Sequence, residues 1–302
     1  MNENSGVDYA VPWIPGKPIH GSSGVGIILQ SNHPDYIPGD LVTASTGWPW
    51  TKYFIQDLPK SESADKTFQK LDKTMFGQKP SLGLSFIVGL TALIGLWEKG
   101  HIVEGANQTL VVSGAAGATG SLAGQMGRLL GCSRVIGICG TDEKCCWLTK
   151  NLNFDGTINY RTDNIGEKLK QLCPNGIDVY FDNVGGDISE AVIKQMNTNS
   201  HVILCGQISV YNKDVPYPPP LSSDTIAVVK ENKITRERFL VLHYKDQFEK
   251  AMQQLMQWIL SEKIQYKETV AEGIENTGQA FVSMMKGGNI GKQIVHVSDA
   301  EL

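Results

Sequence analysis

Residues 109–120 read Thr-Leu-Val-Val-Ser-Gly-Ala-Ala-Gly-Ala-Thr-Gly, and this stretch decides the fold of the chain. Its first five residues form an uninterrupted apolar run, which is typical of a strand buried on both faces. The glycine-rich part predicts a tight turn. After the turn, Leu122, Met126, Leu129 and Leu130 are spaced as one face of a helix. A strand, a glycine turn and a helix in this order predict one unit of a parallel α/β sheet.

The turn has the composition of a site for a diphosphate. Gly114 permits the tight turn, and the small residues Ala116, Gly117 and Ala118 let a phosphate approach the backbone. The N–H groups of the first helical turn and the helix dipole stabilise negative charge there. The alternative is a glycine turn needed only to pack the helix on the sheet. The preceding strand and the second strand that follows favour dinucleotide binding.

Further apolar runs continue the alternation of strands and helices along the chain. The predicted strands are 134–139, 157–160, 178–181, 201–205, 238–243 and 293–297, and a predicted helix over 246–262 carries Phe248, Met252, Leu255 and Ile259 on one face. This alternation predicts a Rossmann-type, doubly wound parallel sheet. Short extended runs at 24–29 and 40–43 predict a β-rich region near the start, and 61–80 reads as a polar connector.

Composition excludes several classes of protein. The 302 residues are 41% hydrophobic with a net charge of −4, which argues against disorder and against a nucleic-acid partner. Six cysteines without a C-x-x-C pair predict buried free thiols in a reducing compartment. Residues 80–97 carry no charge, but small and polar residues dilute them, which favours a buried helix, or a strand followed by a helix, over a membrane span. With no signal-peptide pattern at the start, we expect a cytoplasmic protein.

The end of the second strand predicts which cofactor binds. An NAD site usually carries an acidic residue there, whereas this chain has Gly140-Thr141. Gly140 leaves room for a 2′-phosphate, Thr141 offers a hydroxyl, and Lys144 supplies a positive charge one turn later. Asp142 and Glu143 are expected to cap the following helix. We therefore expect NADPH, the alternative being that Lys144 is an ordinary solvated lysine.

Five segments carry a resemblance to a known family: 113–120, 137–144, 178–186, 205–212 and 287–292. They resemble the zinc-free medium-chain dehydrogenase/reductases, in the leukotriene B4 12-hydroxydehydrogenase/prostaglandin reductase branch. The resemblance covers nearly the whole chain. It implies NADPH-dependent reduction of the α,β double bond of lipid enones, such as 15-oxo-prostaglandins to their 13,14-dihydro products. A quinone or alkenal reductase, and a shortened relative that binds NADPH with little catalysis, are the alternatives.

The resemblance also implies site residues. Tyr211 and Tyr9 are the expected catalytic residues that hydrogen-bond the substrate's keto oxygen, although Tyr9 is equally compatible with a surface aromatic. Ser45 and Thr46 are expected substrate contacts, standing where close relatives carry aromatic residues. No metal is expected. The expected NADPH contacts are Gly117, Ala118, Thr119, Gly120, Lys144, Tyr160, Asn183, Cys205, Gly206, Gln207, Ile208, Ser209, Val210, Tyr211, Phe239, Leu240, Val241 and Asn289.

The resemblance further implies three segments. Residues 1–78 correspond to a GroES-like, β-rich catalytic domain that is incomplete because its opening strands are missing. Residues 79–267 form the NADPH-binding Rossmann domain, and residues 268–302 return to the catalytic domain. The expected partner is a small lipid enone, and the chain is expected to be a monomer or a homodimer.

Overall fold

The computed structural model describes residues 13–14, 16–17, 19–21, 23–44, 47–57, 68–76 and 79–299. Among these residues there are two compact units. The larger unit comprises Val88–Glu268 and Asn289–Lys292. The smaller unit comprises the described residues before Val88, together with Thr269–Gly288 and residues 293–299. The sequence placed the domain boundaries at residues 79 and 268.

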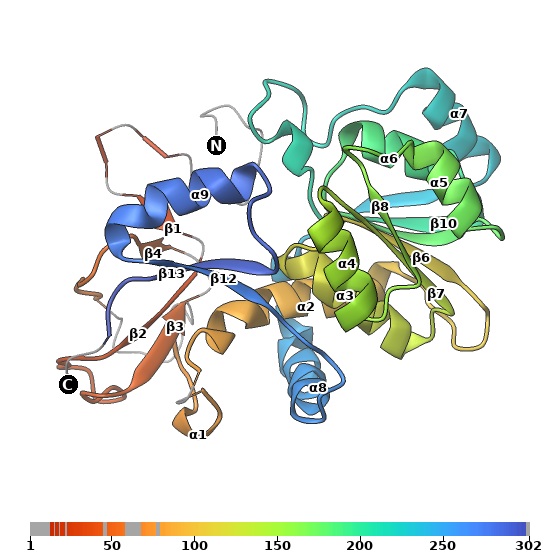
Figure 1. The fold of residues 1–302 in the computed structure, drawn as a ribbon. Helices are drawn as coiled ribbons and strands as arrows, with labels where there is room; N and C mark the ends of the chain where they lie inside the picture. Colours follow the sequence, from red (N-terminus) through yellow and green to blue (C-terminus); the bar gives the residue numbers. More distant parts are fainter. Residues whose placement is uncertain are drawn as a thin grey trace. The chain divides into compact units, whose positions relative to one another are not determined.

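A six-stranded parallel sheet forms the centre of the larger unit (Figure 1). Its strand order is β11-β10-β9-β6-β7-β8, so the order reverses beside β6. The fold class predicted from the sequence is confirmed. The strands are β6 (Thr109–Ser113), β7 (Arg134–Cys139), β8 (Gly156–Asn159), β9 (Ile177–Asp182), β10 (Met196–Leu204) and β11 (Thr235–Arg238).

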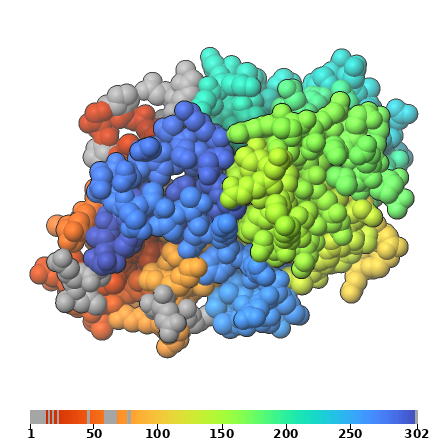
Figure 2. Space-filling model, in the orientation of Figure 1, coloured from red at the N-terminus to blue at the C-terminus, as the bar shows by residue number. Residues whose placement is uncertain are grey.

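Helices cover both faces of this sheet. On one face, apolar residues of α5, α6 and α7 pack with Val111, Ile136 and Tyr180 of the strands. On the other face, α3 packs on β6 and β7, and α4 packs on β7 and β8. The helices are α2 (Leu82–Lys99), α3 (Ala118–Leu130), α4 (Asp142–Asn151), α5 (Ile165–Leu172), α6 (Gly186–Ile193), α7 (Ser223–Glu231) and α8 (Phe248–Leu260), with 3₁₀ turns at Ile208–Val210 and Val241–Gln247. In Figure 2 the yellow-green, green and cyan surface belongs to this unit.

The predicted strands over 109–113 and 134–139 are confirmed residue for residue. The predicted strand over 238–243 is wrong, because the strand is Thr235–Arg238 and Val241–Gln247 is a 3₁₀ segment. β11 is an edge strand with a largely exposed, charged sequence, so it lacks the apolar signal of its neighbours. The apolar residues after it pack in the core as a turn: Phe239 and Val241 are both buried.

Two further expectations need correction. Leu122 and Met126 of α3 are buried, but Leu129 is 37% exposed, so the apolar stripe covers only the first part of the helix. The six cysteines are free thiols, as expected, but they are not all buried, because Cys146 is exposed.

The smaller unit is built from short strands. β2 (Gly24–Ile27), β3 (Leu41–Ala44) and β5 (Phe68–Lys70) form one antiparallel sheet, and β1 (His20–Gly21) pairs with β4 (Trp48–Pro49). A third sheet pairs β12 (Glu268–Glu272) with β13 (Lys292–His296), and the described helices are α1 (Lys73–Phe76) and α9 (Thr277–Met285), with a 3₁₀ turn at Ile274–Asn276. The Trp48 ring of β4 stacks on the Phe68 ring of β5, with 5.5 Å between the ring centres. This contact packs β4 against the three-stranded sheet.

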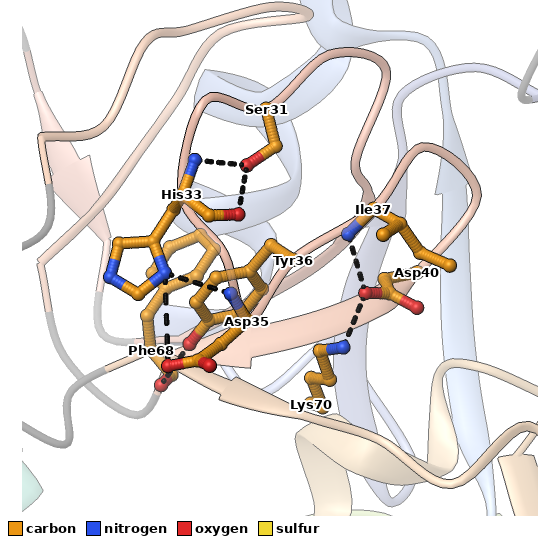
Figure 3. Close-up of polar contacts among 8 residues, drawn as sticks. All are labelled: Ser31, His33, Asp35, Tyr36, Ile37, Asp40, Phe68 and Lys70. Carbon is orange, nitrogen blue, oxygen red and sulfur yellow. Dashed lines mark hydrogen bonds and ion pairs between the residues drawn. The ribbon is translucent and has the colours of Figure 1, made fainter.

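Polar contacts close the loop between β2 and β3 (Figure 3). The carboxylate of Asp40 accepts a hydrogen bond from the Ile37 N–H at 2.9 Å and pairs with Lys70 of β5 at 2.6 Å. The hydrogen bond from Lys70 lowers the pKa of Asp40. The Tyr36 hydroxyl donates to the Phe68 carbonyl at 3.2 Å, so the loop is tied to the same strand twice.

Among the described residues, α2 alone is long and apolar enough to cross a membrane, by its length and hydropathy. Within the structure 56% of it is buried, and the core helix of a soluble protein meets the same criteria. Ala92, Leu93 and Ile94 are fully buried, which matches the sequence expectation of a buried helix.

The packing of α3 leads to a stability prediction. A Cβ on Gly124 would overlap the ring of Phe154. We expect Gly124→Ala to destabilise the protein by about 1–3 kcal/mol through overpacking, which a helix-propensity gain of about 1 kcal/mol only partly offsets. Urea unfolding followed by circular dichroism measures the change. Gly166→Ala in α5 is the control, because its Cβ meets no atom closer than 3.5 Å. Equal urea midpoints for the two variants would contradict the packing argument.

Candidate cofactor and active site

The glycine turn after β6 presents backbone N–H groups at the start of α3. Gly114 adopts a φ of +59°, and the Gly117 N–H donates to the Gly114 carbonyl at 2.9 Å, which closes the turn. A Cβ on Gly120 would overlap that carbonyl oxygen, so the helix packs closely on the turn. The N-cap residue Gly117 offers no side-chain acceptor, and the first turn of α3 carries no acidic residue. This is the local chemistry that a diphosphate requires.

Asn289 belongs to the larger unit, and Gly291, two residues further along the chain, is hydrogen-bonded to the glycine turn after β6. The Gly291 N–H donates to the Ala116 carbonyl at 2.8 Å, and Gly291 forms a parallel bridge with Gly117. The Asn289 side chain donates to the Gly291 carbonyl at 2.7 Å. The sequence assigned residues 268–302 to the other domain, but these hydrogen bonds hold this short segment against the turn.

A group of polar and charged residues follows β7 and β8, where the 2′-phosphate is expected. A Cβ on Gly140 would lie 2.8 Å from the Tyr160 hydroxyl, so glycine is needed for the tyrosine to lie there. Lys144 is half-buried, and burial lowers the pKa of its ammonium group. The charge of Arg161 contributes to the same lowering, and the Arg161 guanidinium carbon lies 5.9 Å from the centre of the Tyr160 ring. The sequence predicted Lys144 and Tyr160 here and missed Arg161.

The helix that carries Lys144 is capped by Thr141, which corrects the expectation for Asp142 and Glu143. The Thr141 hydroxyl oxygen accepts from the Lys144 N–H at 3.3 Å. Asp142 instead accepts a hydrogen bond from the Asn159 side chain at 2.7 Å. The cap fixes the first turn of α4 and therefore the position from which the Lys144 side chain starts.

Asp182, which the sequence reasoning missed, organises the carboxyl edge of the sheet. It is the last residue of β9 and is fully buried. Its two oxygens accept hydrogen bonds from four side chains and two backbone N–H groups, those of Ser113, Tyr180, Ser189, Gln207, Val184 and Gly185. Burial and the nearby Asp182 carboxylate raise the pKa of Tyr180 well above its usual value, so Tyr180 stays a neutral donor. The sequence did carry a signal that could have revealed this residue. The neighbouring parallel strands β6 and β9 each end in a polar residue.

The network reaches two of the predicted cofactor contacts. The Ser113 hydroxyl oxygen accepts a hydrogen bond from the Asn183 N–H at 2.9 Å. The Asn183 side chain in turn donates to the Ser113 carbonyl at 2.8 Å. Gln207 is fully buried and donates through its side chain to Asp182 at 2.9 Å, so this side chain belongs to the network. Asp182 therefore holds the ends of β6, β9 and β10 in one arrangement.

The segment after β10 forms a tight loop that ends at Tyr211. Cys205 and Gly206 both donate their N–H groups to the Asp182 carbonyl at 2.9 Å, and burial raises the pKa of the Cys205 thiol to about 12. The Tyr211 hydroxyl accepts from the Gln207 N–H at 3.4 Å. A Cβ on Gly206 would lie 3.2 Å from that hydroxyl, so the tyrosine lies against the loop backbone.

The remaining expected contacts differ in exposure. Ser209 donates through its hydroxyl to the Val184 carbonyl at 2.6 Å, and Ile208 is 39% exposed. Val210, Phe239 and Val241 are buried, and Leu240 is half-buried. Tyr9, Ser45 and Thr46 lie outside the described residues. In the part of the chain that is described, no three His, Cys, Asp or Glu side chains come together in a way that would hold a metal ion.

These features define a Rossmann-type nucleotide-binding unit with a tyrosine hydroxyl at its carboxyl edge. The family described as "Zinc-binding dehydrogenase" matches residues 118–259. The NADPH-dependent curcumin reductase of Escherichia coli is 36% identical over 91% of this chain and 76% of its own length. Prostaglandin reductase 1 of Bos taurus is 37% identical over 90% of this chain and 79% of its own length.

A solved structure supports the same assignment. The crystal structure of CurA from Vibrio vulnificus in complex with NADPH superimposes with a TM-score of 0.85 at 35% identity, covering 98% of this chain and 85% of that one. The chain therefore belongs to the medium-chain dehydrogenase/reductase superfamily, among the relatives of the NADP-dependent curcumin and prostaglandin reductases.

Lys144 provides the first prediction on the site. We expect Lys144→Ala to weaken NADPH binding by about 1.5–3 kcal/mol, roughly ten- to a hundredfold, because a charged hydrogen bond to the 2′-phosphate is lost. NADH binding should change little, since NADH lacks that phosphate. Fluorescence titration with both nucleotides measures the difference. Lys150→Ala, at the other end of the same helix, is the control. An equal loss for NADH would show that Lys144 does not recognise the phosphate.

Asp182 provides the second prediction. We expect Asp182→Asn to destabilise the protein by about 1.5–3 kcal/mol, because an amide nitrogen would face donors that now donate to a carboxylate. NADPH binding should weaken as well, since the loops at Asn183 and Gly206 lose their anchor. Asp178→Asn is the control at the opposite end of β9, where Asp178 accepts from the Thr109 N–H and the Asn197 side chain. Urea unfolding and NADPH titration of both variants test this, and unchanged NADPH affinity in Asp182→Asn would contradict the positioning role.

Proposed function

We propose that this chain is an NADPH-dependent 15-oxoprostaglandin 13-reductase, of the type of prostaglandin reductase 2. The reaction adds two hydrogens across the double bond of an enone: enone, NADPH and a proton give the saturated ketone and NADP⁺. The observation that carries the proposal is the Tyr211 hydroxyl at the carboxyl end of β10, on the same sheet edge as the phosphate turn. In open α/β sheets ligands bind outside the carboxyl ends of the strands.

The residues at this edge fit NADPH. The start of α3 would hold the diphosphate, Lys144 and Arg161 would hold the 2′-phosphate, and Tyr160 would lie against the adenosine ribose. Asn183 and the loop 205–211 would line the nicotinamide end. When bound, NADPH supplies the hydride. The name of the bovine relative, prostaglandin reductase 1, and that of the Escherichia coli curcumin reductase support this reading.

Tyr211 would stabilise the charge that develops on the substrate. Reduction at the β-carbon of an enone leaves negative charge on the keto oxygen, so a hydroxyl donor at that oxygen lowers the barrier. A tyrosine is suited to this role because its phenolic hydroxyl can donate a hydrogen bond without carrying a charge. The bond from the Gln207 N–H to the Tyr211 oxygen orients the hydroxyl and favours donation of its hydrogen.

The activity test measures NADPH oxidation with 15-oxo-prostaglandin E2, with the product identified by mass spectrometry as the 13,14-dihydro ketone. We expect Tyr211→Phe to lower kcat by about a hundredfold or more, because the enolate loses its donor. NADPH affinity should stay close to that of the wild type, since the phenylalanine ring keeps the packing.

Tyr53→Phe is the control, because Tyr53 is 63% exposed in the smaller unit. Turnover of 15-oxo-prostaglandin E2 at the wild-type rate by Tyr211→Phe would remove the proposed role of this residue. Tight NADPH binding without turnover of this substrate would contradict the proposed reaction itself, and parallel assays with a short alkenal and a quinone would then identify the alternative.

A further inference from the structure

Two cysteine sulfurs meet where β7 ends and α4 begins. Cys139 is the last residue of β7 and is buried, whereas Cys145 lies early in α4 and is half-buried. Their Sγ atoms lie 3.3 Å apart and share a hydrogen bond. A disulfide has an S–S length of about 2.05 Å, so a bond requires the two sulfurs to approach by about 1.3 Å. The two thiols are therefore in contact, and a small shift separates this contact from a bond.

The backbone around the two sulfurs holds them together. The Cys145 N–H donates to the Thr141 carbonyl at 3.0 Å, and the Cys139 Sγ lies 4.0 Å from the same carbonyl oxygen. The helix α4 also packs on β7. Because the two cysteines are close in the sequence, a bond between them would close a short loop. A disulfide stabilises a fold less when its loop is short, which favours a reversible bond over a structural one.

The two thiols differ in access and in protonation. Burial and the hydrogen bond with Cys145 raise the pKa of Cys139, so Cys139 stays a thiol and is the donor of the pair. Cys145 is the more accessible sulfur, so an oxidant in solution reaches it first. Burial raises the pKa of three other cysteines to about 12, namely Cys132, Cys173 and Cys205. Buried thiols of that kind are inert, which leaves the pair as the reactive site.

The sulfur pair adjoins the groups expected at the 2′-phosphate of NADPH. Gly140 and Thr141 follow Cys139 directly, and Lys144 precedes Cys145. The charge of Lys144 also acts on the Cys139 thiol, so the ammonium group lies near the two sulfurs. Drawing the sulfurs into a bond shifts the end of β7 and the start of α4 relative to each other. These are the two chain ends that present the expected phosphate contacts, so the state of the thiols and the binding of the cofactor are coupled.

From this arrangement we infer that Cys139 and Cys145 are an oxidation site, which closes to a disulfide on reaction with a peroxide and thereby weakens the binding of NADPH. In the first step the Cys145 thiol takes one oxygen atom from the peroxide and becomes a sulfenic acid, and the peroxide is reduced to water or an alcohol. The Cys139 sulfur then attacks the Cys145 sulfur, and the sulfenic hydroxyl leaves as water with the Cys139 proton. Two electrons pass from the sulfur pair to the peroxide. The inference does not depend on which enone the protein reduces.

Peptide mapping tests the bond on the full chain. The protein is treated with hydrogen peroxide, its free thiols are alkylated, and it is digested with trypsin without reduction. Trypsin separates residues 135–144 from residues 145–150, so the disulfide is detected by mass spectrometry as these two peptides joined. Cys146→Ser is the matched control, because Cys146 is the exposed neighbour on the same peptide, and Cys145→Ser removes the bond. Absence of the joined peptides from the wild type or from Cys146→Ser, or their persistence in Cys145→Ser, overturns the inference.

Nucleotide titration of the reduced and oxidised protein tests the effect on the cofactor. We expect oxidation to weaken NADPH binding about fivefold or more, within the usual range of coupling between sites, and dithiothreitol to restore it. NADH binding should change less, because NADH lacks the 2′-phosphate. By reciprocity, saturating NADPH should shift the equilibrium from disulfide to thiols by the same factor, measured in a dithiothreitol redox buffer. Equal NADPH affinity in the two forms, or an equal loss in peroxide-treated Cys145→Ser, contradicts the inference.

Discussion

The buried carboxylate of Asp182 is the constraint on which the carboxyl edge of the sheet depends. A fully buried carboxyl group is costly unless hydrogen bonds replace its hydration. Here four side chains and two backbone N–H groups do so, and they come from the ends of β6 and β9, from α6 and from the loop after β10. Each donor that satisfies the carboxylate is thereby positioned. The loops at Asn183 and Gly206 owe their conformation to this group.

Strand order then distributes the chemistry along that edge. The start of α3, with its backbone N–H groups, lies after the central strand β6. Lys144 and Arg161 follow β7 and β8 on one side of β6, and Tyr211 follows β10 on the other side. A dinucleotide that spans the reversal in strand order has its two ends placed on opposite sides of β6.

Local patterns predicted those parts of the fold whose residues carry a strong periodic signal. Strands β6 and β7 are buried apolar runs, and both were predicted to the residue. β11 was misplaced because an exposed edge strand has charged residues and no apolar run. The cap of α4 was assigned to Asp142 and Glu143, whereas Thr141 provides it and Asp142 binds Asn159. Several side chains there can cap, and only packing against β8 selects among them.

By itself, the sequence determined the parallel α/β architecture, the phosphate turn at Gly114–Gly120 and the presence of Gly140-Thr141, in place of an acidic residue, directly after β7, because these depend on neighbours along the chain. Only the tertiary structure decided that Asp182 joins three strand ends, that Arg161 lies near Lys144, and that Gly291 closes on Ala116. Those contacts join residues far apart in the chain. Their geometry follows from the register and twist of the sheet, which no local pattern encodes.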